Sequence, residues 1–166
     1  MRTLGMLAGA GLVLAACAGG QPEPLTISDV NVQTDLTAVG SPRAVDYWQS
    51  LSGDLETAIA NQFVGRIDPA GNTINVDVDE LSLASAFAAG ATAQTAQLSG
   101  QVEVLNPAGT SEGVWNVTAT AQDVVDYFPA GTNLTVVPPT SSAYYQAIVT
   151  AFARGTALAI QAGPEA

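Results

Sequence analysis

Two aspartates in the middle of the chain have a spacing that carboxylate chemistry could use. Asp77 and Asp79 lie two residues apart in Thr73–Ala84, where apolar and polar residues alternate. Residues two apart on a strand point to the same face, roughly 7 Å from each other at a rise of ~3.3 Å per residue. Such a pair could act in carboxylate catalysis or bind calcium. The same Val-Asp-Val-Asp alternation is typical of any strand with one solvated face, which is the simpler interpretation.

The rest of the chain offers few catalytic groups. It contains no histidine and no lysine, and its single cysteine is Cys17. These absences exclude Ser-His-Asp triads, Cys-His pairs and Ser-Lys pairs, together with the usual His and Cys sites for zinc. The residues after Asp77 lack the glycine and the later glutamate of an EF-hand loop. We therefore expect no catalytic residues, no metal site and no cofactor.

The first seventeen residues account for the lone cysteine. Arg2 gives the amino end a positive charge, and the uncharged, apolar segment Leu4–Ala16 follows. This segment is shorter than the ~20 residues that a membrane-spanning helix needs. Its pattern is that of a secretory signal peptide. Its end, Leu14-Ala15-Ala16-Cys17, resembles the lipobox of bacterial lipoproteins.

The resemblance implies cleavage just before Cys17 and acylation of that residue with fatty acids such as palmitate. Two or more acyl chains hold a protein stably on a bilayer. Ala18 resembles the sorting pattern of Gram-negative lipoproteins that are sent to the outer membrane, which implies an anchored protein facing the periplasm. The expected division is a signal peptide (1–16), a lipidated cysteine and tether (17–24), a single α+β domain (25–162) and a tail (163–166).

Charge restricts the partners of the mature chain. Fifteen acidic residues face four basic ones, and the net charge of −11 becomes more negative when Arg2 leaves with the signal peptide. Such a surface repels the phosphates of nucleic acids and anionic lipid headgroups. Apolar residues make up 48% of the chain, which favours a folded domain over disorder. We expect this domain to bind no nucleic acid and to reach the membrane through its anchor.

Hydrophobic periodicity predicts a strand and a helix at the start of the domain. Leu25–Val32 alternates as a strand, with a change of phase near Asp29. Ser41-Pro42 then provides a helix start. A Ser-Leu-Ser-Gly interruption allows this helix to split in two, with Ser52 capping the second part, and Gly65 is expected to end it. The apolar stripe of the helix consists of Val45, Trp48, Leu51, Leu55, Ile59 and Phe63.

Three strands are predicted next. A turn over 68–72 leads into Thr73–Ala84, the strongest strand pattern of the chain, in which a bulge near Asp79–Glu80 would explain a change of phase. After a loop, Ala96–Asn106 and Val114–Ala121 alternate again and form a hairpin.

The last part of the domain is predicted to be mainly helical. Asp123–Gly131 suits a short helical turn, and Leu134–Val137 could add an edge strand before Pro138-Pro139. Ser141 or Ser142 caps a final helix over 143–161. Its small residues Ala147, Ala151 and Gly155 would let another element approach closely.

The predicted order is β-α-β-β-β-(β)-α, which indicates an α+β fold. We expect an antiparallel sheet of four to five strands with two helices packed on one face. The segments LTISDVNVQ, INVDVDELSLAS and the hairpin AQLSGQVEVLNPAGTSEGVWNVTATAQ resemble small α+β outer-membrane lipoproteins of the lipopolysaccharide-assembly lipoprotein type. That resemblance implies a role in the envelope, although the acidic composition argues against capture of lipopolysaccharide phosphates.

Three hypotheses for function remain. The first is a non-enzymatic envelope lipoprotein that binds another envelope protein through its sheet or helix layer. The second is a carrier or chaperone for a small apolar ligand, held between the last helix and the sheet. The aromatic residues that could line such a groove are Tyr127, Phe128, Tyr144, Tyr145 and Phe152. The third, a carboxylate-dependent enzyme around Asp77 and Asp79, requires a cleft at that pair.

Overall fold

A computed structural model describes residues 25–163 of the chain. The expected signal peptide, Cys17, Ala18, the tether (17–24) and the end of the tail (164–166) lie outside these residues. The elements are, in order, β1 (Ile27–Gln33), the 3₁₀-helix η1 (Leu36–Val39), α1 (Pro42–Trp48), α2 (Leu51–Gln62), β2 (Asn72–Val78), α3 (Glu80–Ser85), β3 (Leu98–Leu105), β4 (Ser111–Ala119), α4 (Ala121–Val124), the 3₁₀-helix η2 (Val125–Tyr127) and α5 (Ser142–Ala162).

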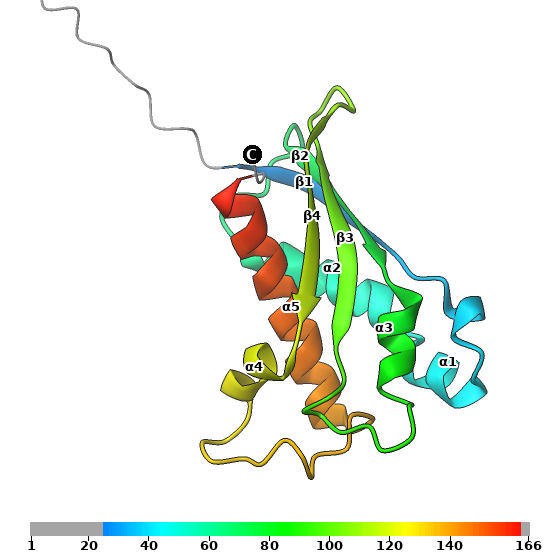
Figure 1. Ribbon diagram of the computed structural model, residues 1–166. Helices are drawn as coiled ribbons and strands as arrows, with labels where there is room; N and C mark the ends of the chain where they lie inside the picture. Colours follow the sequence, from blue (N-terminus) through cyan, green and yellow to red (C-terminus); the bar gives the residue numbers. More distant parts are fainter. Residues whose placement is uncertain (1–24, 164–166) are drawn as a thin grey trace, which may run out of the picture.

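The strands form one mixed sheet in the order β1-β2-β3-β4 (Figure 1). The α+β class is confirmed, but the expectation of an antiparallel sheet is wrong for its first pair, because β1 and β2 are parallel. The chain leaves β1, passes through α1 and α2, and re-enters the sheet in the same direction, as a helical crossover requires. The pairs β2–β3 and β3–β4 are antiparallel, and the predicted hairpin is confirmed.

The optional fifth strand over Leu134–Val137 is wrong. This segment forms turns, and Asn133 holds the first of them by accepting a hydrogen bond from the Thr135 N–H at 3.0 Å. The Val137 carbonyl accepts one bond from the Ala93 N–H, also at 3.0 Å. A single bond between two loops replaces the expected strand pairing.

The first helix splits in two, as the interruption allowed, but two residues earlier than predicted. Ser50, rather than Ser52, is the N-cap residue of α2, and Pro42 begins α1 after Ser41 as expected. The apolar stripe is confirmed for Trp48, Leu51, Leu55, Ile59 and Phe63, which are all buried. Val45 is half-buried, and its neighbour Ala44 takes the buried place on α1.

The predicted long strand Thr73–Ala84 is wrong in its second half. β2 ends at Val78, and Asp79 becomes the N-cap of α3, where its side chain accepts a hydrogen bond from the Leu81 N–H at 2.9 Å. The change of apolar phase therefore marks a new element rather than a bulge. Leu83 turns into the core, whereas Leu81 is exposed.

The two long helices, α2 and α5, lie together behind the sheet in Figure 1. α2 contacts β1, α5 contacts β4 and β3, and the two helices contact each other. The predicted strip of small residues meets β4: a Cβ on Gly155 would lie 3.3 Å from Cγ1 of Val117. The inward side chains of the four strands and the apolar faces of both helices form one hydrophobic core.

The close approach of β3 to β2 should require glycine at position 100. A Cβ at this position would lie 2.7 Å from the Asp77 carbonyl oxygen, which is part of the backbone and has little freedom to move. We expect Gly100→Ala to lower the free energy of unfolding by about 1–3 kcal/mol, measured by urea denaturation. The matched variant Gly53→Ala, in the open on α2, should instead raise it by about 0.5–1 kcal/mol. Equal effects of the two substitutions would contradict this close approach.

Candidate functional site

The candidate site is the face of the sheet that points away from α2 and α5, hereafter the open face. Strand register places one polar side chain from every strand in a row across it: Gln33 pairs with Asp77, Asp77 with Gln101, and Gln101 with Asn116. All four residues are exposed. The row presents three amides and one carboxylate, so it can both donate and accept hydrogen bonds.

A second row on the open face has the same character. Asn31, Asn75 and Glu103 are aligned by register on β1, β2 and β3, and Val114 completes the row on β4. The side-chain amide of Asn31 donates to Oδ1 of Asn75 at 3.3 Å. Pairing across strands thus orders polar groups that the sequence shows only one strand at a time.

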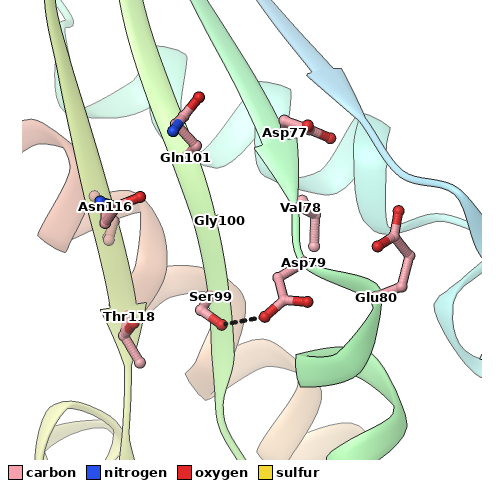
Figure 2. A pocket seen from close by; sticks show the side chains of 10 residues that line it. Asp77, Val78, Asp79, Glu80, Ser99, Gly100, Gln101, Asn116 and Thr118 are labelled. Atoms are coloured by element: carbon pink, nitrogen blue, oxygen red, sulfur yellow. Dashed lines mark hydrogen bonds between the residues drawn. The ribbon is translucent and has the colours of Figure 1, made fainter.

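The open face is hollowed near the end of β2, in the region shown in Figure 2. The hollow has a volume of about 300 Å³, and its lining includes Asp77, Asp79, Ser99, Gln101 and Thr118. It lies over Gly100, where β3 runs between β2 and β4. The hollow is shallow and polar, which suits a protruding polar group of a partner better than an enclosed ligand.

Asp77 and Asp79 have different roles in this structure. Asp77 stands on the open face, where register places it between Gln33 and Gln101. Asp79 caps α3 and accepts a second, longer hydrogen bond from the Ser99 hydroxyl at 3.4 Å (Figure 2). The interpretation of the two aspartates as a pair on one strand is therefore wrong, because Asp79 lies past the end of β2. Among residues 25–163, no group of three or more His, Cys, Asp and Glu side chains is placed to hold a metal ion.

The charges of the open face are all negative. Its strand carboxylates include Asp29, Asp77 and Glu103, and Asp79 and Glu80 follow directly after β2. The three arginines of the described part of the chain lie elsewhere: Arg43 on α1, Arg154 on α5, and Arg66 after α2, where it stacks over Phe63 at 4.7 Å. Charge therefore biases this face toward cationic groups.

The aromatic groove expected between the last helix and the sheet does not form. Phe152 and Tyr144 are fully buried parts of the core, and the hydroxyl of Tyr144 has no hydrogen-bond partner among the described residues. Tyr145 binds α2 instead, donating to Oδ2 of Asp54 at 2.6 Å. Tyr127 is exposed, and Phe128 is half-buried. These five residues are divided among the core, a helix contact and the surface.

An aromatic cluster that the sequence did not predict ties α1 to α5. The ring of Tyr47 lies 4.6 Å from Trp48, 5.6 Å from Phe87 and 5.5 Å from Tyr145, measured between centroids. The Tyr47 hydroxyl lies 3.1 Å from the Pro139 carbonyl oxygen, which it reaches as a donor. Burial raises the pKa of Tyr47, and nearby Tyr144 raises it further. The only signal in the sequence was an aromatic residue next to Trp48, outside the apolar stripe.

No family model, curated protein or solved structure matches this chain. Within residues 25–163, none of the helices combines the length and apolarity needed to cross a lipid bilayer.

The separate roles of Asp77 and Asp79 can be tested by stability. Asp79→Ala removes an N-cap and should lower the free energy of unfolding by about 1 kcal/mol. Asp77→Ala changes an exposed side chain and should alter it by less than about 0.5 kcal/mol. Asp79→Asn keeps a good cap and should restore most of the loss, as measured by urea denaturation. An equal loss for Asp77→Ala and Asp79→Ala would contradict the assignment.

The buried tyrosines predict a loss of stability at alkaline pH. Burial raises the pKa of Tyr144, and burial together with Asp54 raises that of Tyr145. Above the ordinary value of 10.0, the unfolded chain releases these protons first, so the free energy of unfolding should fall as pH rises past 10 and be unaffected below it. Residues 25–163 contain no lysine or cysteine, which leaves the phenols as the main groups that titrate there.

Tyr144→Phe should weaken this alkaline loss in urea denaturation between pH 8 and pH 11. It should also leave the protein folded, because the Tyr144 hydroxyl has no hydrogen-bond partner within residues 25–163 that the substitution would remove. Tyr127→Phe, at an exposed position, is the matched control and should leave the pH dependence unchanged. A Tyr144→Phe variant with the wild-type pH dependence would contradict the prediction.

Proposed function

We propose that this protein is an envelope lipoprotein, without catalytic activity, that binds another envelope protein through the open face of its sheet. The anchor in this proposal is Cys17, supported by the lipobox-like Leu14-Ala15-Ala16-Cys17. Acyl chains on Cys17 would hold the domain at the membrane surface. In a Gram-negative cell, Ala18 after the lipidated cysteine would send the protein to the outer membrane, with the domain facing the periplasm.

The observation that carries the binding role is the extent of the open face. Its two aligned rows cross all four strands, and neither α2 nor α5 covers them. Specific protein interfaces bury about 800 Å² on each partner, which a broad face can supply. A small ligand would need an enclosed site, and the hollow over Gly100 is shallow.

A carrier for a small apolar ligand is the alternative, and it would need a site other than the filled groove beneath α5. One hollow of about 420 Å³, between α1 and two loops, is lined by Arg43, by threonines and by apolar residues that include Phe87, Val137 and Pro138. An amphiphile with an acidic head would match that lining. Lipid that co-purifies with the Cys17→Ser chain would favour this alternative.

The anchor is tested by Cys17→Ser. We expect the wild-type chain to remain with the membrane fraction after high-salt washing, and the variant to appear in the soluble fraction. Mass spectrometry of the wild-type amino terminus should show acylated Cys17. A Cys17→Ser chain that stays with the membranes, or a wild-type Cys17 without acyl chains, would contradict the proposed anchor.

The binding role is tested by Gln101→Arg, which enlarges a side chain at the centre of the open face. In-cell crosslinking should capture one dominant envelope protein with the wild type, and at least tenfold less of it with this variant. Gln146→Arg makes the same change at an exposed position of α5 and should leave capture intact. No dominant partner, or equal capture by both variants, would overturn binding through this face.

A further inference from the structure

The two edge strands of the sheet differ in what their outer edges contact. On β1, the Ile27 N–H donates to the Arg66 carbonyl at 2.9 Å, and the Ile27 carbonyl accepts from the Asp68 N–H at 2.9 Å. The Val32 N–H donates to Oε1 of Glu56 on α2 at 3.2 Å. The Val30 N–H donates to Oδ1 of its neighbour Asp29 at 3.0 Å. These contacts use the hydrogen-bonding groups that an incoming strand would need.

The outer edge of β4 has no such cover. Among the described residues, the backbone of Ser111–Ala119 is hydrogen-bonded to β3 alone. β4 is the longest strand of the sheet, contains no proline or lysine, and carries one charge, at Glu112 near the hairpin end. Natural sheets usually blunt an exposed edge with a charge, a proline or a covering segment. An edge left unpaired over this length is a template for an added strand.

A furrow beside this edge could receive the side chains of an added strand. Between β4 and the end of α5, a hollow of about 300 Å³ is lined by Trp115, Ala159 and Ala162 among others. Further along α5, a second hollow of about 240 Å³ has a mixed lining, which includes the exposed Leu158 and the charged Asp123, Asp126 and Arg154. Because side chains of a strand alternate, every second residue of the partner would point into this furrow and the others would extend the open face.

We propose that the outer edge of β4 pairs with an extended, cationic segment of the partner protein. This inference rests on the proposed function and names the partner's chemistry. Residues of the added strand on the open-face side would lie beside Val114 and Asn116 of β4. The carboxylate of Glu103 is one strand further across the sheet, and that of Asp77 two strands further. The strand residues of that face include carboxylates and no arginine. Lysine or arginine at alternate positions would complement it, with apolar residues between them facing the part of the furrow lined by Trp115, Ala159 and Ala162.

The charge of the chain also favours a cationic segment over a second copy of this chain as the partner of β4. Two copies joined along β4 would bring two open faces with the same carboxylates side by side, in a chain of net charge −11. Like charges in such an arrangement oppose association. A basic segment from a different protein lowers that repulsion instead.

The test uses the full chain in detergent and a synthetic probe, the alternating peptide (Val-Lys)4. We expect hydrogen exchange of the β4 amides to slow at least tenfold in its presence, whereas the β1 amides remain unchanged. Raising the salt from 50 to 500 mM should weaken this protection. The peptide (Val-Glu)4 should protect nothing, and (Val-Lys)4 with N-methylated valines should lose the effect because the backbone donors are removed.

Each other outcome overturns the inference. Protection at β1, equal protection by the Lys and Glu peptides, persistence of protection with the N-methylated peptide, or no protection would each exclude a cationic strand at β4. A dimer in sedimentation that protects β4 without any peptide would identify a second copy as the occupant. None of these results would overturn the proposed function. A partner could still bind through the open face alone, and crosslinking with the Gln101→Arg variant tests that binding independently.

Discussion

The sheet of this domain has helices to bury only one of its faces, and the other features follow from this constraint. α2 and α5 cover the face that carries residues such as Ile74, Val76 and Val102, all of which are buried. A polar group in that layer would lose its hydrogen bonds to water, so the amides and carboxylates of the strands must lie on the other face. The buried Trp48 has a polar indole N–H, which keeps a hydrogen bond by donating to the Leu83 carbonyl at 3.1 Å.

Local signals were enough for much of the fold because they act within a few residues. Ser41-Pro42 begins α1, the change of phase near Asp29 corresponds to the irregular register between Ile27 and Asp29, and the hairpin follows from alternation around a turn. The segment after Val78 has two consistent interpretations, a bulged strand or a capped helix. The structure selects the helix through distant contacts. Ser82 Oγ accepts a hydrogen bond from the Ser99 N–H at 3.0 Å, and the Leu83 carbonyl accepts one from the Trp48 indole N–H.

The candidate site was less predictable than the elements that form it. Alternation alone places Asp77 on a solvated face, but its neighbours depend on strand order and register, which the sequence of one strand does not contain. Gln101 and Asn116 are ordinary polar residues of their strands until pairing brings them into line with Asp77. For the same reason the aromatic residues of α5 suggested a groove, although contacts with β4 and α2 fill that space.

The unequal edges of the sheet bear on where the proposed tether would join the domain. The proposed tether enters the domain through β1, so an open edge there would let the chain's own leading segment compete for strand pairing. Glu56 and the Arg66–Asp68 segment occupy groups along that edge. β4 stands three strand spacings away, about 14 Å at ~4.8 Å per strand. A partner strand at β4 would therefore add to the sheet at the edge opposite β1, where the proposed tether would join the domain, with the open face continuing across both proteins.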